Sequence, residues 1–103
     1  MPSTAFAVDI RTDQDTTLLL SGDINRAAQA GIEDAYERSV DGPGKLVLDF
    51  SDVEFINSTG IALIVGLLAK ARASGRIVIA RGLTEHYREV FLITRLSDFL
   101  DME

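Results

Sequence analysis

Residues 45–75 read KLVLDFSDVEFINSTGIALIVGLLAKARASG, and this stretch decides the fold. Lys45 to Phe50 is a nearly continuous apolar run, which is typical of a strand buried on both faces. A long apolar helix is expected from about Ser58 to Ala73, where a Ser-Gly pair stops it. Residues 51–55 are expected to connect the strand to a polar turn, residues 57–60, that opens the helix.

Strands are also expected on both sides of this stretch. Arg76 to Ala80 reads as a buried strand, so residues 45–80 form one strand–helix–strand unit, with parallel strands and a right-handed crossover. Thr4 to Ile10 and Thr16 to Ser21 predict an antiparallel hairpin. Gly22 and Asp23 are expected to end its second strand.

Two further helices are expected, one in each half of the chain. Asn25 is a plausible cap for a helix from Arg26 to about Val40, and Thr84 for one that ends near Ile93. The third helix turns Tyr87, Val90 and Phe91 inward. The tail, residues 96–102, fits either an edge strand or a final helical turn. The sequence therefore predicts an α/β fold, a mixed sheet of four or five strands with helices packed largely on one face.

The length and composition indicate a soluble protein made of one domain, residues 1–103. The net charge of −6 disfavours a nucleic-acid partner, because phosphate contacts need a basic face. Cysteine is absent, so no disulfide or thiolate metal site is expected. The N-terminus lacks the pattern of a signal peptide. The uncharged run from Phe55 to Ala69 is shorter than the roughly 20 residues of a membrane-spanning helix. We expect a cytoplasmic protein that does not insert into membranes.

Catalytic chemistry finds little support in the sequence. A serine at a strand-to-helix turn is a candidate nucleophile, but the only histidine, His86, has no identifiable acidic partner and is expected on a helix surface. No glycine-rich nucleotide-binding motif is present. Asp49, Asp52 and Glu54 are expected to be solvated loop carboxylates rather than metal ligands. No catalytic residue, metal or cofactor is therefore expected.

Recognition of another protein is the remaining role for this region. Residues 61–69 are apolar nearly all round the expected helix, which indicates either an exposed binding patch or full burial between the sheet and its neighbours. Asn57 or Ser58 can cap the helix, a contribution of about 1 kcal/mol. Because one polar residue suffices for a cap, three in succession are more than capping requires.

The chain resembles the STAS domains, in particular the bacterial anti-sigma-factor antagonists. The segments that carry the resemblance are Ser21-Gly22-Asp23-Ile24, residues 46–51 with Val53 and residues 55–56, Ser58-Thr59-Gly60-Ile61, Gly75, and the closing pattern of residues 90–94 with Leu96 and Phe99. They extend over nearly the whole length. The resemblance implies the STAS fold.

The resemblance also implies a function. The partner would be an anti-sigma factor that is a protein serine kinase, and it would phosphorylate Ser58, with Thr59 as the alternative. The unphosphorylated form would bind this partner and release the sigma factor, and a protein phosphatase would reverse the modification. The expected interface comprises the Asp23–Ile24 loop and the helix end, with Asp23, Ile24, Asn57, Ser58, Thr59, Gly60 and Ile61.

One position departs from the family pattern. Many members carry Asp immediately before the serine, whereas this chain has the uncharged Asn57. The alternative role is a STAS subunit of a larger assembly, such as a lipid-transport or stress-sensing complex, without a phosphoswitch. An enzymatic role as a small nucleotide hydrolase lacks the residues it needs.

Overall fold

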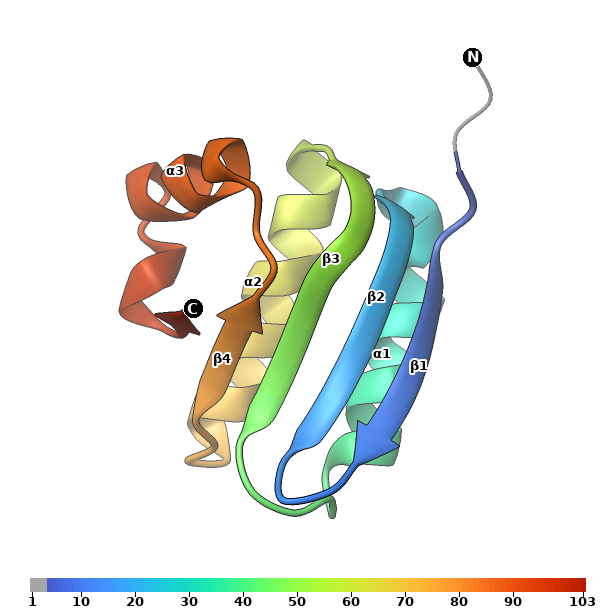
Figure 1. Ribbon diagram of the computed structural model, residues 1–103, viewed down its shortest axis with the longest axis vertical. Helices are drawn as coiled ribbons and strands as arrows, with labels where there is room; N and C mark the ends of the chain where they lie inside the picture. The colour runs from blue at the N-terminus through green and yellow to red at the C-terminus, as the bar shows by residue number, and fades with distance from the viewer. Residues whose placement is uncertain (1–3) are drawn as a thin grey trace.

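The structure, a computed structural model, describes residues 4–103 as a five-stranded sheet with helices packed against it (Figure 1). The first three residues, which begin the expected single domain and the segment expected to lack a signal peptide, lie outside the described part. The elements in chain order are β1 (Ala7–Thr12), β2 (Thr16–Ile24), η1 (Arg26–Ala28), α1 (Gln29–Ser39), β3 (Leu46–Ile56), α2 (Ser58–Ala73), β4 (Val78–Arg81), α3 (Glu85–Ile93), η2 (Leu96–Asp98) and β5 (Asp101–Met102).

The sheet is mixed, and its strands lie in sequence order from β1 to β5. β1 pairs with β2 antiparallel, and every later pair is parallel. α1 and α2 lie side by side behind the sheet in Figure 1. β3 and β4 point upward in this view, β4 lies to the left of β3 and α2 passes behind them, so the β3–α2–β4 crossover is right-handed. The predicted α/β class, hairpin and parallel unit are confirmed.

The core lies between the sheet and the helices. Along β2, buried and half-buried residues alternate strictly, because one face of the strand packs on the helices. The residues between them, such as Leu19, point to the other face. The buried side chains of the core include Leu18, Leu20, Ile24, Ala28, Ile32, Ala35, Tyr36, Leu46, Leu48, Phe50, Ile56, Ile64, Leu67, Leu68, Ala71, Val78, Ala80, Phe91, Leu96 and Leu100.

Two strands are longer than the sequence predicted. β2 does not end at Gly22 and Asp23 but continues to Ile24, and residues 51–55 are not a connection but part of β3. The two polar segments pair with each other, with Asp23 opposite Phe55. Register shifts in this ladder and the positive φ of Gly22 (77°) accommodate residues that are usually found in turns.

The predicted helix caps are correct. The side-chain oxygen of Asn25 accepts a hydrogen bond from the Ala27 N–H (3.0 Å), although the helix begins there as a 3-10 turn. The hydroxyl of Thr84 accepts one from the Tyr87 N–H (3.2 Å) and so begins α3. β1 lies slightly later in the chain than the predicted residues 4–10.

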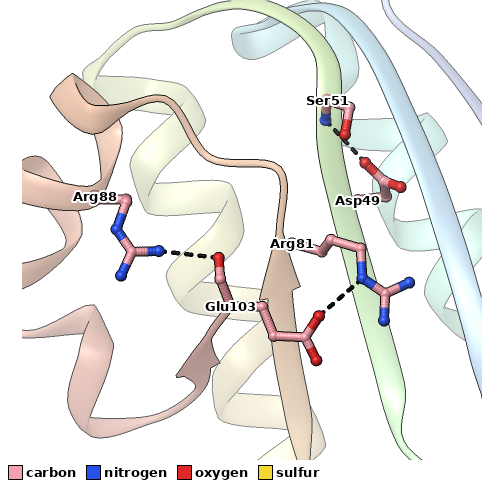
Figure 2. A network of polar contacts seen from close by, with 5 residues as sticks. All are labelled: Asp49, Ser51, Arg81, Arg88 and Glu103. Atoms are coloured by element: carbon pink, nitrogen blue, oxygen red, sulfur yellow. Dashed lines mark hydrogen bonds and ion pairs between the residues drawn. The ribbon is translucent and has the colours of Figure 1, made fainter.

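The tail contains both of the alternatives, a 3-10 turn followed by a short strand. Figure 2 shows how the strand is held: Arg81 forms an ion pair with the Glu103 carboxylate (2.9 Å), and Arg88 donates to the Glu103 backbone oxygen (2.9 Å). The hydrogen bond from Arg81 to Glu103 raises the pKa of the arginine. No helix within residues 4–103 has the length and apolar character needed to cross a membrane.

Candidate functional site

The polar turn lies between the end of β3 and the start of α2. Asn57 has extended backbone and is the N-cap, because its side-chain oxygen accepts a hydrogen bond from the Gly60 N–H (2.8 Å). Ser58 is the first residue of the helix, and it is exposed. Within the part of the chain that the structure describes, its hydroxyl forms no hydrogen bond. Of the two possible caps, Asn57 therefore has this role and leaves Ser58 free.

The first turn of α2 is pressed against the end of β2. The Asn57 N–H donates to the carbonyl oxygen of Ile24 (3.3 Å). A Cβ atom on Gly60 would overlap that same oxygen, so only glycine allows this approach. The backbone that carries Ser58 is therefore seated directly on β2.

The structure brings all seven predicted interface residues to one end of the sheet but exposes them unequally. Ser58 and Thr59 are exposed, whereas Asp23, Asn57 and Ile61 are half-buried. Ile24 and Gly60 are buried. The prediction for Ile24 and for an Asp23–Ile24 loop needs correction: these residues end a strand, and the Ile24 side chain is in the core. Ile24 supports the turn through its carbonyl group rather than through its side chain.

The apolar helix α2 has one buried side and one exposed side. Ile64, Leu67 and Leu68 are buried in the core, and Ile61 and Leu63 are half-buried. The exposed positions are Ala62, Val65, Gly66 and Ala69, of which only Val65 is large. Most of the bulky apolar surface is thus used for packing, and the exposed surface that follows Ser58 along the helix is built mainly from small side chains.

Two residues near the turn, Phe55 and Tyr87, were not predicted to belong to the site. Phe55 lies beside Asp23 in the β2–β3 ladder and is 53% exposed, which adds an aromatic surface to this end of the sheet. The hydroxyl of Tyr87, on α3, accepts a hydrogen bond from the backbone N–H of Ile56 (2.8 Å). The inward spacing of Tyr87 was recognised, but its contact crosses 31 positions of sequence.

The arrangement offers no support for catalysis by Ser58. His86 is exposed on α3, as predicted, and its ring packs edge-on against the Tyr87 ring with centroids 4.9 Å apart. Asp49 accepts a hydrogen bond from the Ser51 N–H (2.9 Å; Figure 2), and Asp52 and Glu54 are exposed on β3 rather than in a loop. No cluster of three or more potential metal-ligating side chains occurs among residues 4–103.

Comparison with known proteins identifies the family. A family model described as "Mlab, STAS domain" matches residues 8–101. The chain belongs to the STAS domain family, which confirms the resemblance inferred from its motifs. No curated protein gives a significant match.

Solved structures extend the comparison. An anti-sigma factor antagonist from Mycobacterium paratuberculosis is 27% identical, with a TM-score of 0.73 over 95% of this chain and 85% of that chain. The Bacillus cell fate determinant SpoIIAA in its phosphorylated form is 20% identical (TM-score 0.66; 96% and 91% covered). A sulfate transporter family protein from Wolinella succinogenes is 10% identical (TM-score 0.73; 88% and 80% covered). At these identities the last two matches show the shared fold alone.

Proposed function

We propose that this chain is an anti-sigma-factor antagonist whose binding to a kinase-type anti-sigma factor is switched by phosphorylation of Ser58. The observation that carries the proposal is the exposed Ser58 hydroxyl, unbonded within the described chain, on the first turn of α2. Similarity to the mycobacterial antagonist supports the regulatory role. In this role the protein is cytoplasmic and has no catalytic activity of its own, and a protein phosphatase restores the unmodified form.

The physical chemistry of the turn suits a phosphate on Ser58. Asn57 and Gly60 use their N–H groups in the contacts described above, whereas those of Ser58 and Thr59 have no acceptor in the described chain. A phosphate brings about −1.5 to −2 charges at pH 7. Negative charge at a helix N-terminus is stabilised by about 0.3–1 kcal/mol. Phosphorylation is therefore expected to preserve the fold and to act on the interface.

The residue before the serine, Asn57, also favours phosphorylation of Ser58. It caps the helix through a neutral amide oxygen, so no carboxylate stands directly before the phosphoacceptor. A carboxylate there would repel the phosphate. The departure from the family pattern is thus expected to ease accumulation of the phosphorylated form, and recognition must come from other groups, such as Asp23 and the exposed ring of Phe55.

The test is phosphorylation of the purified chain. The protein is incubated with a candidate kinase-type anti-sigma factor, ATP and Mg²⁺, and the products are mapped by mass spectrometry. We expect one phosphate, on Ser58, and none in Ser58→Ala. Thr59→Ala is the matched control, because Thr59 is the exposed neighbour and the alternative acceptor. Modification of Thr59 alone would move the acceptor site, and absence of modification with every candidate kinase would exclude the switch.

A second candidate is a permanent STAS subunit of a larger assembly, such as a lipid-transport complex. The description "Mlab" of the matching family model favours it. In such a complex the Ser58 end is expected to pack on its partner without modification. Stable co-purification with a membrane complex, unaffected by Ser58→Ala, would support this candidate over the phosphoswitch.

A further inference from the structure

We infer that Tyr87 is a positioning residue for Ser58: its hydroxyl holds the backbone of the β3–α2 turn so that the phosphoacceptor is presented in a fixed orientation. This inference rests on the proposed function, and it gives α3 a part in the phosphorylation of Ser58. The observation is the hydrogen bond from the Ile56 N–H to the Tyr87 hydroxyl oxygen (2.8 Å).

The need for this contact follows from the unequal lengths of two neighbouring strands. The β3–β4 ladder ends with Asp49 opposite Arg81, yet β3 continues to Ile56. On the side that faces β4, the last part of β3 has no strand partner among residues 4–103. Ile56 is buried at 5% exposure, and a buried N–H without an acceptor is strongly unfavourable. The Tyr87 hydroxyl supplies the acceptor that the short strand cannot.

α3 is anchored firmly enough to fix the position of this hydroxyl. Phe91 is fully buried and packs edge-on against Phe50 of β3, with ring centroids 5.7 Å apart and an interplanar angle of 88°. Thr84 caps the helix on the Tyr87 N–H itself. The backbone of the tyrosine is therefore held by the helix cap, and the next turn of α3 is anchored in the core by Phe91.

The turn is consequently held from two sides. On the β2 side, the Ile24 carbonyl accepts from the Asn57 N–H, and on the α3 side Tyr87 accepts from the preceding residue. Ile56 is two residues before Ser58, so a shift of its peptide group displaces the serine hydroxyl. Phosphoryl transfer depends on an aligned acceptor oxygen, and a displacement of about 1 Å can lower the rate up to roughly 100-fold.

The test is Tyr87→Phe, which removes only the hydroxyl. With the kinase-type anti-sigma factor that phosphorylates the wild-type chain, we expect kcat to fall about tenfold and KM to change less than about twofold, because binding surface is retained while alignment is lost. We also expect the amides of Ile56, Asn57 and Gly60, which are hydrogen-bonded in the structure, to exchange with solvent about tenfold faster, the loss expected for one net hydrogen bond.

The matched control is Thr16→Val, which also removes one buried, hydrogen-bonded hydroxyl, at the opposite end of β2. It is expected to lower stability without changing kcat. Wild-type kcat in Tyr87→Phe, or an equal loss in Thr16→Val, would overturn the inference. If no kinase phosphorylates the wild-type chain, the proposed function fails, and the inference is then decided by exchange: equal rates at the turn in the two variants would refute it.

Discussion

The two ends of the central strands use small polar residues in opposite ways. At the end where β2 begins, the Arg76 guanidinium donates to the carbonyl oxygens of Ser39 (2.6 Å) and Gly42 (3.0 Å) and to the Thr16 hydroxyl (3.2 Å). The Thr16 hydroxyl in turn donates to the Pro43 carbonyl (2.8 Å). Every polar group in this cluster, which we call the Arg76 cluster, has a partner inside the protein.

At the other end, the turn of residues 57–60 has hydrogen-bond acceptors within the described chain for the N–H groups of Asn57 and Gly60. Asn57 caps the helix, Gly60 allows close packing, and the hydroxyl groups of Ser58 and Thr59 remain exposed. Polar residues at strand ends therefore stabilise the fold where they hydrogen-bond to one another. Where the helix cap leaves polar side chains exposed, as at residues 58 and 59, they are available to a binding partner. The contrast can be tested by substitutions at both ends.

The largest loss of stability is expected from Gly60→Val. Its side chain would overlap the Ile24 carbonyl oxygen, a backbone atom that cannot move aside, so the free energy of unfolding should fall by about 3 kcal/mol. The matched control is Gly66→Ala in the same helix, where an added Cβ meets open space and should stabilise by about 0.5–1 kcal/mol. Urea unfolding measures both. A small effect of Gly60→Val would show that α2 is not seated on β2 as described.

Arg76→Met should lower the free energy of unfolding by about 2 kcal/mol, because it removes the guanidinium hydrogen bonds to the buried Thr16 hydroxyl and to the Ser39 and Gly42 carbonyl oxygens. Arg76→Lys should recover only part of this loss, since an ammonium cannot reproduce the planar fork. Phosphorylation of the folded variants should be unchanged. If Arg76→Met were not phosphorylated at temperatures where it remains folded, the Arg76 cluster would have a part in recognition as well as in stability, which would contradict the proposed contrast.

Asn57→Ala should lower the free energy of unfolding by about 1 kcal/mol, because the Gly60 N–H loses its cap. Asn57→Asp keeps the capping oxygen and adds charge at the helix N-terminus, so the unmodified protein should be at least as stable as the wild type. Thermal unfolding measures this order. If Asn57→Asp were as unstable as Asn57→Ala, the cap would not be the source of the effect.

The smallest change of stability is expected from Ser58→Ala, within about 0.5 kcal/mol, because the side chain is exposed and unbonded in the described chain. Ser58→Asp should retain the wild-type far-ultraviolet circular dichroism but lose affinity for the anti-sigma factor. A large loss of secondary structure in Ser58→Asp would refute a switch that acts only at the interface, and unchanged affinity would refute the switch itself.

Much of the fold could be predicted because its signals are local. The apolar run of β3, the caps Asn25 and Thr84, and the start of α2 at Ser58 were each read from a few adjacent residues. The extension of β2 and β3 was not, since Gly22 and Asp23 usually mark turns. Only pairing between the two strands makes an extended backbone favourable there.

The sequence by itself determined most of the element types, the polar turn and the family, because periodicity, capping and motifs depend on neighbouring residues. Only the tertiary structure decided that Ile24 is buried, that Tyr87 bonds to the β3–α2 turn, and that Arg76 reaches a hydroxyl 60 positions away. These contacts join residues whose proximity is created by the sheet and its packed helices, so no local pattern encodes them. What distinguishes the exposed Ser58 from the buried Thr16 is the set of partners that folding places around each.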